Sequence, residues 1–186
     1  MNRLLRLATI SSTLALAALS VRAAEPGYVD LGTFKPTDGC QFVEVNVHSS
    51  LLKLASMFAD RDNHDAAELI RNLKHVRVNV IGYNDQTRAD LAKRVDDIRR
   101  DLVAQGWSQA VTVREPNKDQ DVAIYVKTAG DDTVEGLLVT VMDPDEKQAV
   151  LVNVVGNIKP EQIAALGRQM HIEPLAQLSI PAGKSS

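Results

Sequence analysis

The chain has little cysteine and few aromatic residues: Cys40 is its only cysteine, and Phe, Trp and Tyr together make up 4% of it. A single cysteine cannot form an internal disulfide, so the fold must be held together by its core. Surfaces that stack sugars or nucleic-acid bases generally need aromatic side chains. The composition therefore argues against a carbohydrate-binding or base-stacking protein and for a domain packed from aliphatic side chains.

No segment of the chain reaches the roughly 20 uninterrupted apolar residues that cross a bilayer. The first 23 residues instead have the three parts of a secretory signal peptide. These are a cationic head (Met1–Arg6), an apolar stretch (Leu7–Leu19) that Ser11–Thr13 interrupts, and the small-residue site Val21–Ala23. We expect cleavage after residue 23, a mature protein that begins near Ala24, and a periplasmic or secreted location.

The mature chain is acidic. Removal of residues 1–23 takes away Arg3, Arg6 and Arg22 and no acidic residue, which changes the formal net charge from −3 to −6. Phosphate backbones and anionic membrane surfaces repel such a chain, so nucleic acid is not an expected partner. Cys40 lies far from the cleavage point, where a lipoprotein would carry its modified cysteine. No membrane anchor is therefore expected after cleavage.

Residues 24–42 are rich in glycine and proline and are predicted to form an extended leader. Valine then alternates with polar residues over 43–47 and again over 76–80, the period of two that indicates half-buried strands. Between these strands, Leu51, Leu54, Ala55 and Phe58 recur at helical spacing, as do Ala66, Leu69, Ile70 and Leu73. Two strands that bracket helices favour a right-handed parallel crossover.

A third helix is predicted from Leu91, Val95, Ile98 and Leu102, which lie on one helical face. Thr87 with Asp90 resembles a capping box, and Gly106 is a natural left-handed terminator. Asp90 with Arg94 and Asp96 with Arg100 are spaced to form ion pairs on the outer face. This helix is expected to pack one face on the core.

From Trp107 onward the pattern predicts strands alone, at 111–113, 122–126, 134–142 and 149–155. The last two runs are apolar on nearly every residue, which indicates strands that are covered on both faces. A short helix follows from Pro160, and 171–186 is expected to be a flexible tail. The predicted fold is a single α+β domain over 43–170, with a mostly antiparallel sheet of about six strands and helices mainly on one face.

The stretches Gly136–Val139 and Leu151–Ile158, after Gly106–Trp107 at the close of a charged helix, resemble the bacterial domain of unknown function 4252. The resemblance covers roughly Val43 to Leu166. It implies an exported envelope domain without an assigned activity, linked in some bacteria to surface signalling. Because lipoprotein versions carry an anchoring cysteine, this chain departs from them.

Candidate catalytic residues do not form a recognisable motif. Ser108 lies in a sequence similar to a hydrolase elbow, but it follows a helix and opens a strand, the reverse of the required order. Cys40 and His48 would be roughly 26 Å apart along a strand, too far for a dyad. Cys40 is interpreted as an unreactive free thiol, with a cross-link between two chains or a reactive thiol as the alternatives. Whether the protein is an enzyme is left open, with the absence of a motif favouring a non-enzyme, and no cofactor is expected.

Metal sites are also weakly indicated. Asp60–Asp65 resembles a calcium loop, but it lacks the central glycine and has Arg71 in place of the closing glutamate. The four histidines lack zinc-ligand spacing. The turns of the meander place several carboxylates at one end of the sheet, and these are the weak candidates for a cation site: Glu115, Asp119, Asp121, Asp143, Asp145 and Glu146.

Two classes of function remain. The first is a soluble, non-enzymatic module that binds an envelope protein through a face or edge of its sheet, with a homodimer through the sheet as a possible form. The second is an enzyme, or a protein that binds a small ligand or cation, whose site is assembled only in three dimensions. A pocket lined by convergent polar groups would favour the second class.

Overall fold

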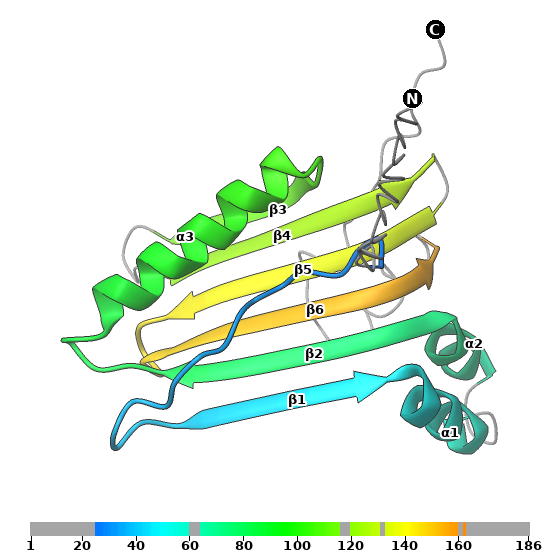
Figure 1. The fold of residues 1–186 in the computed structure, drawn as a ribbon, viewed down its shortest axis with the longest axis horizontal. Helices are drawn as coiled ribbons and strands as arrows, with labels where there is room; N and C mark the ends of the chain where they lie inside the picture. The colour runs from blue at the N-terminus through cyan, green and yellow to red at the C-terminus, as the bar shows by residue number, and fades with distance from the viewer. Residues whose placement is uncertain (1–24, 60–63, 116–119, 131–132, 160–161, 163–186) are drawn as a thin grey trace, which may run out of the picture.

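The computed structural model describes residues 25–59, 64–115, 120–130, 133–159 and 162. They form one six-stranded sheet in the order β1-β2-β6-β5-β4-β3, in which every neighbouring pair is antiparallel (Figure 1). The elements are β1 (Phe42–His48), α1 (Ser49–Ala59), α2 (His64–Asn72), β2 (Leu73–Gly82), α3 (Arg88–Ala104), β3 (Ser108–Glu115), β4 (Gln120–Ala129), β5 (Thr133–Asp143) and β6 (Gln148–Ile158). The predicted α+β class with its mostly antiparallel sheet is confirmed.

The four strands β3 to β6 form the predicted meander, since each is hydrogen-bonded to the next. β5 and β6 lie in the middle of the sheet, which explains why they are apolar on nearly every residue. Leu137 and Leu138, for example, are consecutive on β5, point to opposite faces and are both buried. The continuous apolar run is therefore the signature of a central strand.

The predicted parallel crossover between the first two strands is wrong. β1 and β2 are antiparallel neighbours, with Val45 opposite Val78. α1 and α2 form a pair at one end of the sheet instead of crossing a face (Figure 1). α1 and α2 fold back on each other, so the chain enters β2 at the same end of the sheet at which it leaves β1. Antiparallel neighbours are joined in this way, whereas parallel ones need a connection that crosses to the other end.

α3 packs on the sheet through Leu91, Val95 and Leu102, which are buried in the main core, as predicted. Thr87 is at the N-cap position but makes no side-chain capping bond. The Thr87 hydroxyl is hydrogen-bonded to Asn84 instead, and Asn84 Oδ1 also accepts hydrogen bonds from the backbone N–H groups of Gln86 and Thr87 in the turn before the helix. The predicted capping box is therefore absent, and a turn that begins at Asn84 precedes the helix.

The charged groups of α3 find other partners than the predicted ones. Arg94 donates to the backbone oxygens of Leu31 and Thr33, at 2.8 and 2.9 Å. Arg100 pairs with Asp97. Gly106 has the expected left-handed conformation, with φ of 79°. A helix that lies on a sheet can thus use an outer arginine to hold a neighbouring segment.

Residues 25–41 run across the sheet beside α3 without forming a strand, and part of this segment belongs to the core. Val29, Leu31 and Phe34 are buried there. Asn153 of β6 holds the segment with both ends of its amide, because Nδ2 donates to Gly27 O (3.1 Å) and Oδ1 accepts from Val29 N (3.0 Å). The segment therefore covers the part of this sheet face that α3 does not cover.

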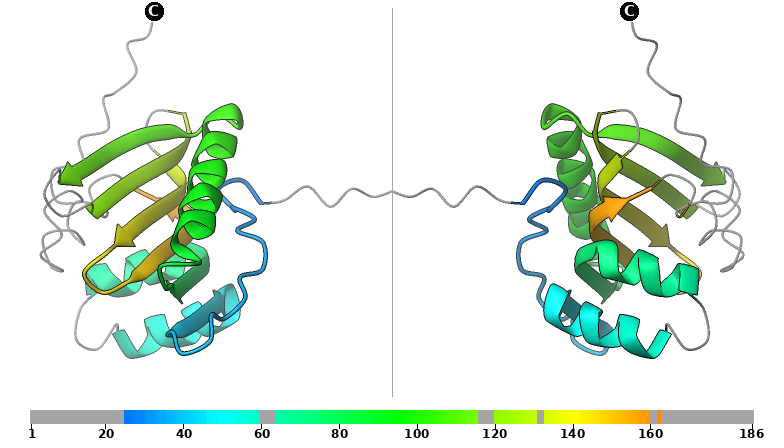
Figure 2. Two further views of the ribbon diagram at one scale, coloured as in Figure 1. Left: turned by 90° about the vertical axis from the view of Figure 1, so that its left-hand side faces the viewer. Right: turned by 90° about the vertical axis from the view of Figure 1, so that its right-hand side faces the viewer.

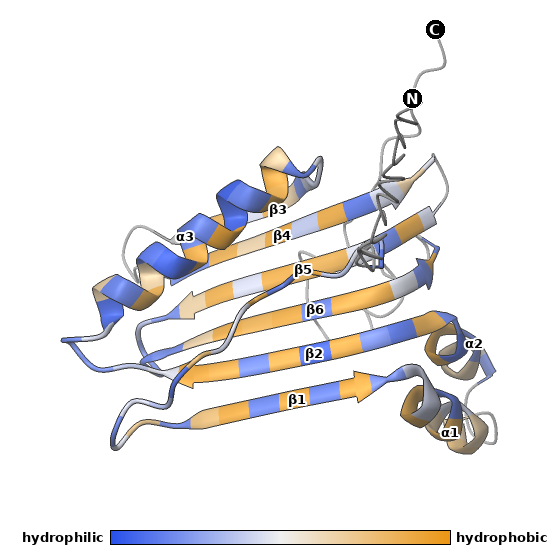
Figure 3. Cartoon of the chain, viewed as in Figure 1, coloured by the Kyte–Doolittle hydropathy of each residue, from blue (hydrophilic) through white to orange (hydrophobic). Residues whose placement is uncertain are grey.

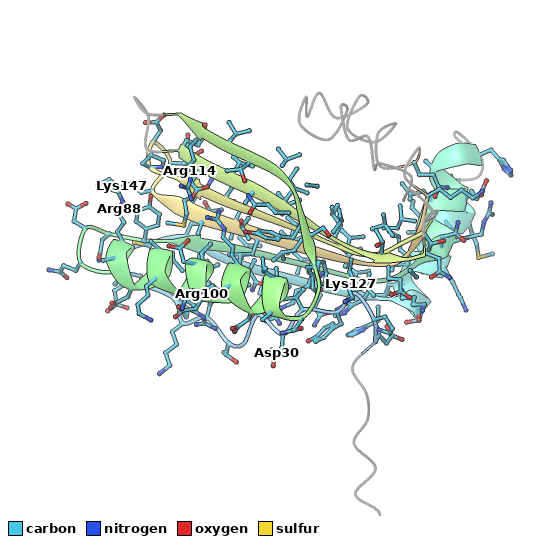
Figure 4. The ribbon with its side chains drawn as sticks, turned by 90° about the horizontal axis from the view of Figure 1, so that it is seen from above. Asp30, Arg88, Arg100, Arg114, Lys127 and Lys147 are labelled. Carbon is cyan, nitrogen blue, oxygen red and sulfur yellow. The ribbon has the colours of Figure 1, made fainter. Side chains whose placement is uncertain are left out.

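The two faces of the sheet therefore differ. One face, here the covered face, carries α3 and the segment 25–41 (Figure 2). The opposite face, here the valine face, is almost entirely aliphatic, and the alternation along the strands is visible in Figure 3. Carbon-only side chains stand on it in Figure 4. By register it consists of Val43, Val45, Val47, Val76, Val78, Val80, Val111, Val113, Val122, Ile124, Val126, Leu137, Val139, Val141, Val150, Val152 and Val154.

No helix in the described part of the chain is long and apolar enough to cross a membrane. Several predictions fall outside the described residues: the signal peptide (1–23), the loop after α1 (60–63), the first meander turn (116–119) and the tail (171–186). The same holds for the helix predicted after Pro160, apart from Gln162.

Candidate functional site

Exposed large apolar side chains gather on β1 and α1. Met57 and Phe58 of α1 are 70% and 62% exposed, and Val45 of β1 is 41% exposed. We call the surface formed by these residues the β1–α1 surface, and it follows one margin of the molecule (Figure 1). Its members are Val43, Val45, Leu51, Leu54, Met57 and Phe58.

The first helix forms as predicted, but all four residues of its predicted apolar face are exposed, Ala55 among them. Leu51, Leu54 and Phe58 are exposed, while the buried residues are Leu52 and Ser56. α1 packs mainly on α2 and touches the sheet only at the sheet's end, so it hides a narrow strip. Helical spacing identifies an apolar stripe, but it does not say whether this chain covers the stripe.

Within the described part of the chain, β1 is an edge strand without the usual protection. Its seven residues pair with β2 in an unbroken register, from Phe42 opposite Ile81 to His48 opposite His75. Gly82 N–H donates to Gln41 O at 2.7 Å, so residues 43, 45 and 47 bond toward β2 by the alternation of an antiparallel ladder. The N–H and C=O groups of residues 42, 44, 46 and 48 therefore point away from the sheet.

The opposite edge is built differently. The pairing of β3 with β4 shifts register between Gln109 and Val111, and β3 carries the exposed Arg114. Bulges and charged side chains are the devices by which proteins prevent edge strands from pairing. β1 has no bulge, and its one charged side chain, Glu44, is held on the covered face by Arg77 at 3.0 Å. Of the two edges, β1 is the one fitted to accept another strand.

A cleft of about 700 Å³ lies between α3 and strands β3 and β4. At its base, the buried Arg99 places Nη1 2.7 Å from Asp121 Oδ2 and donates from Nε to Thr140 Oγ1 at 2.9 Å. Arg99 Nη2 and Asp121 Oδ1 are buried and have no hydrogen-bond partner. Arg100 and Arg114 also line the cleft, from α3 and β3 (Figure 4). The lining carries three arginines against two carboxylates, Asp96 and Asp121, so the cleft has a net positive charge.

Three rings stack at the end of the sheet where β1 meets α1. His75 lies between Tyr28 and His48, with ring centroids 5.4 and 4.6 Å away. Its Nε2 is hydrogen-bonded to Asn46 Oδ1. Burial, followed by the charges of His48 and Arg77, lowers the pKa of His75 below its ordinary value. The stack thus favours a neutral His75.

The candidate cation-binding residues that the structure describes make separate interactions. Asp121 is paired with Arg99 and Arg114. Asp143 Oδ1 accepts hydrogen bonds from the backbone of Asp145 and Glu146 and so shapes the turn between β5 and β6. The side chain of Glu115, like Asp119, is outside the described part. Within the described ranges, no group of three or more His, Cys, Asp or Glu side chains is arranged to hold a metal ion.

The other singled-out residues lie apart from one another. Cys40 is a free, half-buried thiol before β1, and His48 ends that strand. Ser108 begins β3 after α3, the order that the sequence indicates. Sequence reasoning missed the histidine stack and the cleft because their members are distant in the chain. The one available signal was Arg99, which lies between Val95 and Leu102 on the helical face that was predicted to be buried.

A family model described as a domain of unknown function (DUF4252) matches residues 37–166. The comparison with curated proteins found no match.

Proposed function

The chain belongs to the family of the domain of unknown function DUF4252, and from the geometry of its surface we propose that it is an exported protein-interaction module. The observation that carries this proposal is the β1–α1 surface, where an unprotected strand edge adjoins exposed leucine, methionine and phenylalanine side chains. Exposed apolar patches of this kind mark contact sites for other proteins. The partner that fits is an extended segment of another chain with apolar residues at alternate positions, which adds to the sheet as a strand beside β1.

Strand addition draws on both parts of the surface. The outward N–H and C=O groups of residues 42, 44, 46 and 48 supply main-chain hydrogen bonds, which give affinity for any extended chain. The side chains of Val43 and Val45 and the stripe on α1 supply apolar contacts, which select a segment with apolar residues at alternate positions. A partner with a β-branched, alternating sequence is therefore favoured over a polar one.

The test compares two lysine variants on the same face of the sheet but at opposite edges. Val45→Lys places a charge on the proposed edge, and Val113→Lys places one on β3 as the matched control. The partner captured from envelope extract by the wild type should be lost with Val45→Lys and retained with Val113→Lys. The purified partner should also slow amide hydrogen exchange at Glu44 and Asn46. Identical capture by both variants would refute the proposal.

Export is the second part of the proposal, and its support comes from the start of the chain. The cationic head, the interrupted apolar run and the small-residue site form a signal peptide pattern. Cleavage near Ala24 leaves the whole segment 25–41, with its buried Val29, Leu31 and Phe34, in the mature protein. N-terminal sequencing of the protein from fractionated cells should find residue 24 at the start, in the envelope fraction. Uncut protein in the cytosol would contradict export.

A second candidate function rests on the cleft beside α3. The excess of arginine over carboxylate side chains in its lining favours a small molecule with a carboxylate or phosphate group, which Arg100 and Arg114 on the rim can reach. Titration with inorganic phosphate and with acetate, followed by thermal shift, tests this alternative, with Arg114→Gln as the variant that should weaken binding. Equal melting temperatures with and without these anions would speak against it.

A further inference from the structure

We propose that the strand added at the edge of β1 is β1 of a second copy of this chain, so that two sheets join into one continuous antiparallel sheet. This inference rests on the proposed function and names its partner. The first reason is symmetry. Most homo-oligomers are two-fold dimers that use the same patch on both subunits, and two copies of one edge strand meet that condition when they run antiparallel.

The sequence of β1 selects one register for this pairing. With the two-fold axis at Val45, Glu44 faces Asn46 of the other copy and Phe42 faces His48, so no like charges are opposed. All four residues whose N–H and C=O groups point outward then lie in hydrogen-bonded pairs. An axis at Glu44 would oppose two carboxylates, and an axis at Asn46 would leave Phe42 without a partner. The register about Val45 satisfies the most hydrogen bonds.

The faces of the sheet also match in this arrangement. The two-fold axis is perpendicular to the sheet, so the valine faces of both copies lie on the same side and Val43 meets Val47 of the other copy. Each α1 follows His48 directly and therefore comes to lie beside the beginning of the partner's β1. The exposed stripe of Leu51, Leu54 and Phe58 then adjoins the second chain.

The available area suits a stable dimer. At their observed exposure, the six side chains of the β1–α1 surface offer roughly 100 Å² each, or about 600 Å² per chain. A standard interface buries about 800 Å² per partner. The backbone of the seven-residue strand edge adds to this area.

Cysteine substitution tests the register directly, in a Cys40→Ala background. At the two-fold axis, residue 45 would face its own copy in a pair that is not hydrogen-bonded, with Cα atoms about 4.5 Å apart. That distance lies within the range of a disulfide. Val45→Cys should therefore form a covalent dimer under mild oxidation. Val43→Cys, with similar exposure on the same strand, should not, because its two copies would be about 13 Å apart. A mixture of Val43→Cys and Val47→Cys should cross-link again.

Light scattering and sedimentation of the processed protein give the second readout. We expect twice the monomer mass for the wild type and for Val113→Lys, and at least a roughly tenfold weaker dimer for Val45→Lys, because two lysines would meet at the axis. Circular dichroism checks that Val45→Lys is folded. If it is not, the cross-linking of the cysteine variants still tests the dimer. A wild type that stays monomeric, or equal cross-linking of Val43→Cys and Val45→Cys, overturns the dimer. If the wild type is monomeric but captures a different protein from envelope extract, and Val45→Lys does not capture it, then the proposed function stands and the dimer does not.

Discussion

Replacement of Asp121 by asparagine should destabilise the protein strongly, although the new side chain has nearly the same shape. Asp121 Oδ2 lies 2.7 Å from Arg99 Nη1, and the Arg99 side chain is only 8% exposed. Without the carboxylate, the nearest acid to Arg99 is Asp96, 3.5 Å away and largely exposed. The guanidinium would remain buried with most of its charge uncompensated.

The expected magnitude follows from the burial of the two partners. Removal of one member of a buried ion pair costs about 3–5 kcal/mol. Because the Asp121 side chain is 24% exposed and Asp96 stays close, we expect the lower end, about 3 kcal/mol. Arg99→Met should cost less, since Asp121 then keeps Arg114 at 3.8 Å and reaches solvent. The double variant should be more stable than Asp121→Asn alone, because no unpaired charge stays buried.

Urea unfolding, followed by the fluorescence of Trp107, measures these differences. Trp107 is the only tryptophan and is buried in the core, so its emission should report loss of tertiary packing. The four proteins form a double-mutant cycle from which the interaction between the two positions is obtained. A double variant as unstable as the sum of the single changes would refute the reasoning.

Three further predictions concern the covered face. Asn153→Leu should lower the free energy of unfolding by about 1–3 kcal/mol in urea, since it leaves buried backbone groups of the segment 25–41 without partners; an unchanged value would contradict this role. Gly136→Ala should cost about 1–3 kcal/mol in the same assay, because an added Cβ would lie 2.4 Å from Gly27 Cα, and a neutral effect would show that the two backbones can separate. Burial and the charge of His48 lower the pKa of His75 in the folded state, so the protein should be most stable above about pH 6.5 and should lose stability as the pH falls below that value. Melting temperatures measured between pH 7.5 and 5 should show this loss of stability. In His75→Phe the melting temperature should depend less on pH, because residue 75 can no longer be protonated.

Most of the fold could be predicted from local pattern. Alternating valines located the edge and near-edge strands, and unbroken apolar runs located the two central ones. The spacing of Leu91, Val95 and Leu102 identified the buried face of α3. These signals work because each reports on side chains within one element.

The direction of β1 against β2 could not be predicted in this way. Two helices between two strands are compatible with a crossover or with a return at the same end, and the choice depends on how α1 and α2 pack on each other. The candidate site shows the same limit. An apolar helical stripe is typical of a core-facing helix, yet Leu54 and Phe58 are exposed because nothing in the described chain covers them.

The sequence by itself determined which segments are strands and helices, and with them the α+β class, as well as the net negative charge of the chain, because these depend on composition and on spacing within a segment. Only the tertiary structure decided that β1 is an edge strand that no described residue covers, that the stripe on α1 is exposed, and that Arg99 meets Asp121. Each of these depends on which elements become neighbours, and that is set by the packing of the whole chain.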